Sequence, residues 1–152
     1  MTTNTPKLRF KEFTDEWQEK KLGSISSLIT KGTTPTSVGF KFLSAGINFI
    51  KAENISKQGG IDISSTPKVS NECDFALRRS RLSESDILFS IAGTLGRTAI
   101  IKKAHLPANT NQALAIIRLK PGTRLKFVND YLNSQKIKKR IYQLLSIGAQ
   151  PN

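Results

Sequence analysis

The chain has 152 residues, of which 38% are hydrophobic and 23% charged, a composition that fits one folded domain and excludes general disorder. Its 24 Lys and Arg residues against 11 Asp and Glu residues give a formal net charge of +13. Residues 76–152 hold 14 basic and 3 acidic side chains (+11), whereas residues 1–75 hold 10 and 8 (+2). This asymmetry is typical of nucleic-acid-binding proteins, and a basic surface that only confers solubility is the alternative.

The first half of the chain predicts a polar arm followed by short elements. Residues 1–16 are expected to form a flexible N-terminal arm, and residues 17–152 one domain. Residues 17–23 predict an extended entry, residues 24–29 a helical turn or short helix, and residues 31–39 a loop rich in glycine and proline. Strands are expected at about 47–51 and at 61–64. A helix is expected over about 71–79, with Ser70 as its N-cap.

The second half predicts the centre of a sheet and then two helices. Apolar runs indicate strands at about 86–92, 97–102 and 112–119, and the last, apolar on both faces, is expected to be central. Helical periodicity covers about 124–133 and 135–146. The expected fold class is therefore α+β: a single domain on one twisted, mixed or mainly antiparallel sheet with peripheral helices. The strand at 47–51 is expected to join the other three in the centre of that sheet.

The segment Gly93-Thr94-Leu95-Gly96 lies between two of these strands. Its GxxG spacing differs from that of a P-loop or a dinucleotide-binding loop, and the helix whose N-terminus would hold phosphate does not follow it. The segment instead predicts a tight turn in which glycine supplies positive φ and from which Thr94 and Arg97 project.

The sequence offers no catalytic constellation. With Cys73 as the only cysteine and His105 as the only histidine, an internal disulfide and a zinc cluster are excluded, and no nucleophile–histidine arrangement is suggested by position. Scattered carboxylates do not predict a Mg²⁺ site, and no methyltransferase motif for a flipped base occurs. No apolar run is long enough to span a membrane. We therefore expect a non-catalytic binder without cofactor or metal, in a reducing cytoplasmic setting.

Polar and basic side chains beside loops are the candidates for nucleic-acid contact. They fall in the loop at 31–36, the segment 51–57, the basic cluster at 78–81 and the turn at 94–97. The candidate DNA-binding residues are Lys31, Thr33, Thr34, Lys51, Asn54, Ser56, Lys57, Arg78, Arg79, Arg81, Thr94 and Arg97. Arginine suits phosphate or guanine, and asparagine can pair with adenine through two hydrogen bonds.

Several of these polar residues have a structural interpretation of similar weight. Asn54 and Thr94 can equally well bond to nearby backbone. The basic run at 136–140 is either a solvated helix face or a direct DNA contact. Asn111 and Gln112 are expected to be internal braces, because a strand begins there.

Seven stretches of the chain form a specific set when they are taken in order. They are residues 17–23, 31–35, 50–55, 82–101 (which includes DILFSIAGTLG), 109–117, 131–132 and 148–152. From about residue 15 to the last residue, this set resembles the target recognition domain of type I restriction–modification specificity subunits.

The resemblance implies sequence-specific binding of double-stranded DNA without catalysis. Members of that family typically hold two such domains separated by long helices, read the two halves of a split target, and hold methyltransferase subunits, and through them restriction subunits, on it. With one domain and no helical spacer, this chain is expected to be an N-terminal half-subunit or a truncated form. A general basic RNA-binding or ribosome-associated protein is the alternative. The sequence speaks against it because it shows no run of exposed aromatics, and Phe and Tyr mostly occur in apolar, core-like contexts.

Overall fold

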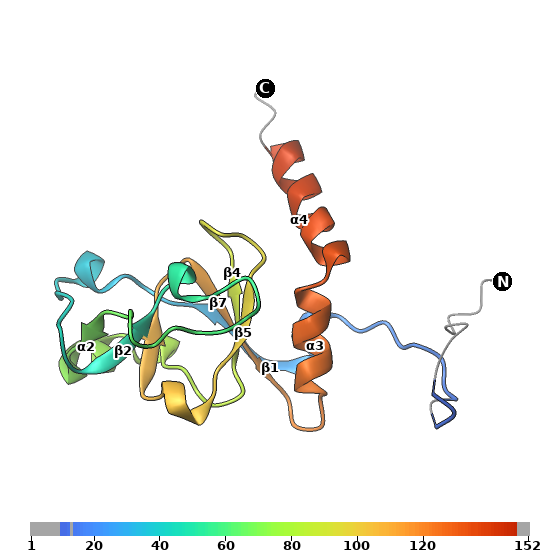
Figure 1. Cartoon of the computed structure of the whole chain (residues 1–152), viewed down its shortest axis with the longest axis horizontal. Coiled ribbons are helices and arrows are strands. Elements are labelled where there is room, and N and C mark those ends of the chain that lie inside the picture. The colour runs from blue at the N-terminus through green and yellow to red at the C-terminus, as the bar shows by residue number, and fades with distance from the viewer. Residues whose placement is uncertain (1–9, 13, 149–152) are drawn as a thin grey trace.

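The structure is a computed structural model that describes residues 10–12 and 14–148, with side chains described as far as residue 143. It contains two small β-sheets, with two consecutive helices beside them at the C-terminal end (Figure 1). The α+β class expected from the sequence is confirmed. The single central sheet is not, because the strands divide between two sheets.

The larger sheet has four antiparallel strands in the order β1-β7-β4-β5. They are β1 (Ser26–Lys31), β4 (Ile87–Ser90), β5 (Thr98–Ile100) and β7 (Leu114–Leu119). The prediction that the strand apolar on both faces is central is confirmed, since β7 pairs with β1 on one side and β4 on the other. The helical turn expected at 24–29 is wrong for most of that segment, because pairing with β7 draws residues 26–31 into a strand.

The smaller sheet has three strands in the order β3-β2-β6. They are β2 (Ile47–Ile50), β3 (Lys68–Val69) and β6 (Ala108–Thr110), and β2 runs antiparallel to β3 and parallel to β6. The strand expected at 47–51 thus exists but belongs here. The strand expected at 61–64 is wrong: Ile61 forms only an isolated bridge with Ile55.

Within the described residues, four helices and four 3-10 turns accompany the sheets. The helices are α1 (Leu22–Ile25), α2 (Asn71–Ala76), α3 (Leu125–Leu132) and α4 (Gln135–Gly148). The predicted N-cap of α2 is confirmed, since the Ser70 hydroxyl accepts a hydrogen bond of 3.2 Å from the backbone N–H of Cys73. The helix expected to reach residue 79 ends at Ala76 and gives way to a 3-10 turn at Arg78–Ser80.

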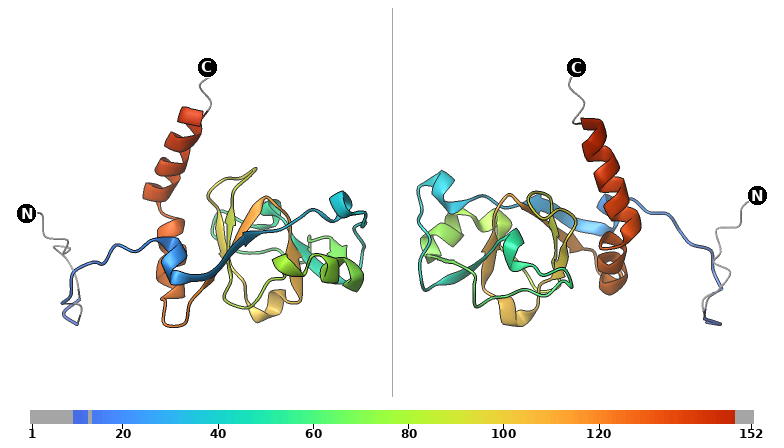
Figure 2. Two further views of the ribbon diagram at one scale, coloured as in Figure 1. Left: turned by 180° about the vertical axis from the view of Figure 1, so that it is seen from behind. Right: turned by 45° about the horizontal axis from the view of Figure 1, so that its top comes forward.

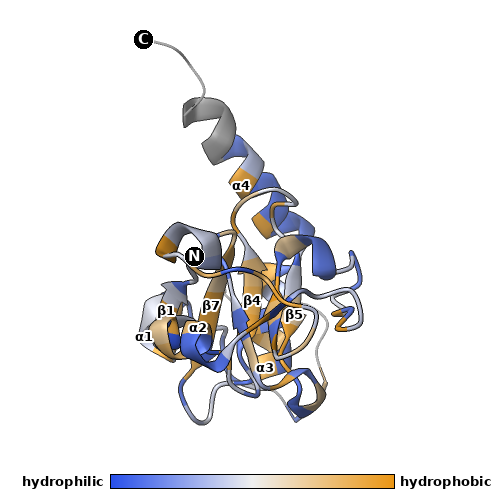
Figure 3. Cartoon of the chain, turned by 90° about the vertical axis from the view of Figure 1, so that its left-hand side faces the viewer, coloured by the Kyte–Doolittle hydropathy of each residue, from blue (hydrophilic) through white to orange (hydrophobic). Residues whose placement is uncertain are grey.

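The two C-terminal helices are attached to the sheets differently. Val128 of α3 packs with Ile87 and Ile117 of the larger sheet in one apolar cluster, so α3 is anchored. Helix α4 then extends beyond the sheets (Figures 1 and 2). Figure 3 shows apolar residues concentrated on β4, β5 and β7, whereas the coloured part of α4 is largely hydrophilic. The apolar core therefore lies in the sheets, and the described side chains of α4, at residues 135–143, are mostly exposed.

Candidate nucleic-acid interface

Three loops meet at one end of the four-stranded sheet. Lys31 at the end of β1 pairs with Ala115, and Ser90 at the end of β4 pairs with Leu114, so both strands end where β7 begins. The N–H of Gly32 donates to the carbonyl of Asn111 at 3.2 Å, which ties the first loop to the segment before β7. The loops at 32–34, 91–97 and 111–113 therefore form one surface, which we call the loop end.

Gly32 allows the closest approach at the loop end. A Cβ atom at this position would lie 1.9 Å from the carbonyl oxygen of Thr110. Thr110 is itself buried, and its hydroxyl donates a hydrogen bond of 2.7 Å to the carbonyl oxygen of Ile50. Only glycine allows β1 to pass this close to β6. The position of the 32–34 loop is therefore fixed by the absence of a side chain.

The turn between β4 and β5 has the predicted backbone. Gly93 and Gly96 both have positive φ, 70° and 77°, as expected for a tight strand connection. The hydroxyl of Ser90 closes the turn by donating to the carbonyl of Thr94 and accepting from the N–H of Arg97. The Thr94 hydroxyl itself is buried and has no hydrogen-bond partner among the described residues, so it does not project from the turn.

Arg97 joins this turn to the 51–57 segment. Its Nη1 donates to the carbonyl oxygen of Ile55 at 2.7 Å, so part of the guanidinium serves as an internal brace. Ser56 and Lys57, which follow directly, are exposed. The structure thus brings the 51–57 segment and the 94–97 turn together, as a shared contact surface requires.

The other members of the 51–57 segment are less available. Lys51 is half-buried, with its ammonium 3.7 Å from Glu53 and 4.7 Å from the ring centre of Phe42. Asn54 is buried: its Oδ1 accepts from the Lys51 N–H at 2.9 Å, and its Nδ2 donates to Ser65 at 3.1 Å. In this conformation Asn54 cannot present its amide to a base, and the structural interpretation of this residue is the one that its geometry supports.

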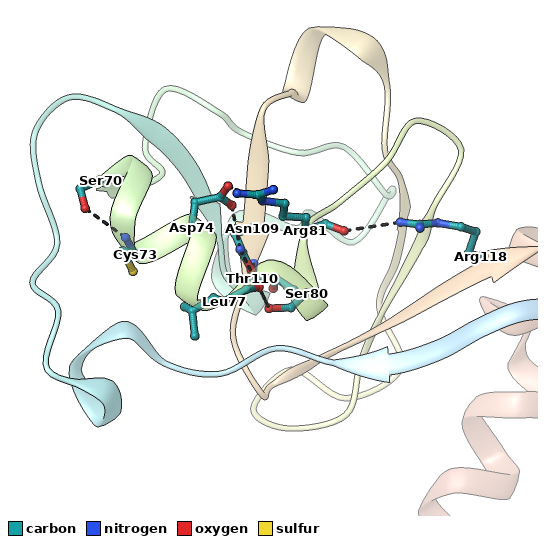
Figure 4. Close-up of polar contacts among 9 residues, drawn as sticks. All are labelled: Ser70, Cys73, Asp74, Leu77, Ser80, Arg81, Asn109, Thr110 and Arg118. Carbon is teal, nitrogen blue, oxygen red and sulfur yellow. Dashed lines mark hydrogen bonds and ion pairs between the residues drawn. The ribbon is translucent and has the colours of Figure 1, made fainter.

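A buried polar network positions the basic cluster at 78–81 (Figure 4). Asn109 of β6 donates to Asp74 of α2 at 2.9 Å and accepts from the hydroxyl of Ser80 at 2.7 Å. The second oxygen of Asp74 accepts from Nε of Arg81. Because these links run from β6 to the 3-10 turn Arg78–Ser80, they hold its backbone against the smaller sheet.

The three arginines of the cluster differ in how free they are. Arg81 is tied to Asp74, whereas no hydrogen bond or ion pair to a side chain holds Arg78 or Arg79 within the described part of the chain. Both are exposed, and Arg78 lies with its guanidinium 5.4 Å from the ring centre of Phe75. Arg78 and Arg79 are therefore the members of the cluster that are open to an anion.

A shallow hollow joins this cluster to the loop at 31–36. It has a volume of about 480 Å³ and is lined by Thr33 and Val38 on one side and by residues 76–80 on the other, Arg78 and Arg79 among them. Thr34, next to Thr33, donates from its hydroxyl to Gln112. The candidate residues thus form two neighbourhoods: one around the hollow and one around the contact between Arg97 and Ile55.

Gln112 and the aromatic residues are not where the sequence interpretation placed them. Gln112, expected to be an internal brace, is exposed at the loop end. The expectation that Phe and Tyr mostly lie in core-like positions is wrong, because these side chains, like that of Trp17, are exposed: Phe10, Phe75, Phe127, Tyr131 and Tyr142. Some of their ring faces are occupied, since Phe127 stacks on Trp17 and Tyr131, with ring centres 5.6 and 6.4 Å apart.

The basic run at 136–140 mostly follows the pattern of a solvated face. Lys136, Lys139 and Arg140 are exposed, and Ile137 and Ile141 are half-buried. Lys138 and Ile141 lie beside the β4–β5 turn: a Cβ at Gly96 would be 3.5 Å from Cγ of Lys138 and 3.7 Å from Cδ1 of Ile141. Helix α4 therefore packs against the turn that carries Arg97.

Other features limit the chemistry of the described residues. They include no group of three His, Cys, Asp or Glu side chains that could hold a metal ion. Burial raises the pKa of the Cys73 thiol, which opposes formation of a reactive thiolate. In the same residues, no helix is long and apolar enough to cross a bilayer.

Comparisons with known proteins agree with this arrangement. A family model described as the type I restriction modification DNA specificity domain matches residues 14–152. The EcoBI specificity subunit of a type I restriction enzyme from Escherichia coli is 32% identical over 92 residues, which cover 59% of this chain and 19% of that subunit.

Two solved structures share the fold. The HsdS subunit from Thermoanaerobacter tengcongensis superimposes with a TM-score of 0.56 at 18% identity, over 75% of this chain and 26% of that one. A chain from a structural study of complex assembly and conformational transition of the type I R-M system also gives 0.56, at 19% identity, over 73% and 25%. The chain thus spans about a fifth to a quarter of the length of these relatives. It belongs to the type I restriction modification DNA specificity domain family.

Proposed function

We propose that the chain, through a recognition domain at residues 17–152, reads one half of a bipartite double-stranded DNA target for a type I restriction–modification specificity subunit. The observation that carries this proposal is the gathering, at one end of a rigid sheet, of loops with basic and polar side chains from segments far apart in the sequence. Family membership gives that surface its ligand class.

We expect some residues of the interface to contact phosphates and others to contact base edges. Arg78 and Arg79 beside the hollow, with Lys31 and Lys57, supply mobile cations for phosphates. Thr33, Ser56 and the remaining donors of Arg97 lie where polar groups can reach base edges. Asn54 and Thr94 would act indirectly: the Asn54 side chain holds the 51–57 segment, and the Thr94 carbonyl accepts the Ser90 hydrogen bond that closes the turn.

The proposed role is recognition without catalysis or cofactor. Methyltransferase subunits, and restriction subunits through them, are the proposed protein partners, and the cytoplasm, where the DNA is, is the proposed location. Since the chain would read half of a split site, its binding in isolation is expected to be weak and sensitive to salt. Selectivity is expected to increase after assembly with the methyltransferase subunits.

The test is a titration of cognate duplex, scrambled duplex and single-stranded RNA at two salt concentrations, with the chain alone and in the assembled complex. We expect the complex to prefer the cognate duplex and the isolated chain to bind both duplexes weakly. Equal or tighter binding of the RNA would support the general RNA-binding alternative. Tight, salt-insensitive and selective binding by the isolated chain would contradict the expectation that selectivity depends on assembly with the methyltransferase subunits.

A further inference from the structure

We propose that Gln112 is a DNA-backbone anchor, whose amide N–H groups donate to a phosphate oxygen and whose orientation is set by Thr34. The inference rests on the proposed function and adds a contact residue at its interface.

The amide of Gln112 is held from one side only. The Thr34 hydroxyl donates to Oε1 of Gln112 at 2.5 Å, across 78 positions of sequence, while the Gln112 side chain is otherwise exposed. This contact directs Oε1 toward the 32–34 loop. The Nε2 group, with its two donors, is then left for a partner outside the protein.

Both residues of the pair stand on constrained backbone. The carbonyl of Thr34 accepts from the N–H of Ser37 at 3.1 Å and from its hydroxyl at 2.7 Å, at the start of the 3-10 turn Pro35–Val38. On the other side, Oδ1 of Asn111 accepts from the N–H of Ala113 at 3.1 Å and closes the turn that carries Gln112. The Thr34–Gln112 hydrogen bond therefore joins two turns whose backbones are already held in place.

The chemistry of the Gln112 amino group selects the ligand. Glutamine reads adenine through its carbonyl and its amino group together, and here the carbonyl is already engaged by Thr34. A phosphate oxygen only accepts hydrogen bonds, so it matches a group that has donors alone to offer. Lys31, exposed at the end of β1, lies at the same loop end and adds positive charge. The DNA backbone, which is anionic and accepts hydrogen bonds, matches both the charge of Lys31 and the donors of Gln112.

The experiment compares Gln112→Ala, Thr34→Val and Lys31→Ala in the assembled complex, each titrated with cognate and scrambled duplex over a salt series. Gln112→Ala is expected to weaken the binding of both duplexes by the same factor, about tenfold or somewhat more, because it removes a hydrogen bond from a neutral donor to a charged phosphate oxygen. Its salt dependence should match that of the unsubstituted protein, because a neutral donor releases no counterion. Lys31→Ala should instead lower the slope of log K against log salt by about one. Thr34→Val, which keeps the shape but not the donor, should give part of the Gln112→Ala loss.

A second measurement locates the contact. A series of cognate duplexes carries one neutral methylphosphonate each, at successive positions of the backbone. At the phosphate that Gln112 contacts, this replacement should weaken binding of the unsubstituted protein but should not further weaken binding of Gln112→Ala. Urea unfolding should leave Gln112→Ala as stable as the parent, since the side chain is exposed.

The outcomes separate the inference from the function beneath it. A Gln112→Ala effect confined to the cognate duplex would make this residue a base reader and overturn the anchor, as would no effect on either duplex. If the unsubstituted complex showed no preference for the cognate duplex, the proposed function would be contradicted. The anchor would still be tested, because it predicts that Gln112→Ala loses the same affinity for both duplexes.

Discussion

Arg118 of β7 holds the carboxylate of Asp86 at two points, Nε to Oδ1 at 2.7 Å and Nη2 to Oδ2 at 2.8 Å. Asp86 is fully buried, and the N–H of Ser83 donates to its Oδ2 at 2.7 Å. The hydrogen bonds to Asp86 raise the pKa of the Arg118 guanidinium further. Asp86 thus neutralises Arg118, a cation that could otherwise be counted toward DNA binding.

Replacement of Arg118 should therefore reduce stability more than DNA binding. Arg118→Met leaves a carboxylate buried without its counterion, and the free energy of unfolding should fall by about 3 kcal/mol or more. Arg118→Lys keeps the charge but loses the two-point geometry, so its free energy of unfolding should fall by less. Urea unfolding followed by circular dichroism measures both. Equal stability of all three proteins would show that the pair has no role in stability.

Gly32 should tolerate no side chain. In Gly32→Ala the new methyl would lie 1.9 Å from the Thr110 carbonyl, so β1 and its loop must move away from β6. We expect a loss of about 1–3 kcal/mol in unfolding free energy, as for overpacking, together with weaker DNA binding. Gly23→Ala is the matched control: it lies in α1 with no atom within 4 Å, and should be neutral or slightly stabilising. Similar unfolding midpoints for the two variants would contradict the close approach.

The arginines at 78–81 should separate into a contact role and a structural role. Arg79→Ala should leave stability unchanged and lower the salt slope of DNA binding by up to about one, because its charge is free. Arg81→Ala should cost about 1–2 kcal/mol of stability, since it removes a hydrogen-bonded cation from the buried Asp74. Lys103→Ala serves as the control, an exposed cation beyond the end of β5 remote from the loop end. A Lys103→Ala salt slope lowered as much as that of Arg79→Ala would show that net charge alone decides binding.

His105 should make stability fall as the solution is acidified. Burial, and then the charge of Lys102, lower the pKa of His105 below 6.5, and its Nδ1 accepts a hydrogen bond of 3.1 Å from the Lys102 N–H. Because the unfolded chain binds the proton more readily, this contribution is complete above about pH 6.5 and is lost as the pH falls through the lower folded value. An NMR titration of the imidazole measures the folded pKa, and His105→Asn, which keeps an acceptor, should flatten the pH dependence between pH 7 and 5. A folded pKa above 6.5 would reverse the sign.

Local patterns were sufficient for the elements whose cause is local. The Ser70 cap needs a hydroxyl three residues before an N–H, and the β4–β5 turn needs glycines at the two positions that take positive φ. The two apolar faces of residues 114–117 predicted the central position of β7 because a strand covered on both faces has nowhere else to lie. The loop segments of the interface were likewise predicted, since glycine, proline and basic residues mark them.

Pairing between distant segments decided the rest. Periodicity reports that a strand has a buried face and not which strand lies beside it, so the parallel pairing of β2 with β6, about 60 residues apart, was not predictable. The same limit applies to polar side chains. Asn54 and Gln112 are similar amides beside loops, yet Asn54 is buried against Ser65 and Gln112 is exposed beside Thr34. The sequence alone determined the family, the charge and the elements whose cause is local, such as the capped start of α2 and the strands β4, β5 and β7. The tertiary structure decided that residues 26–31 form a strand, and which polar groups face inward, because pairing and burial depend on partners that folding brings together.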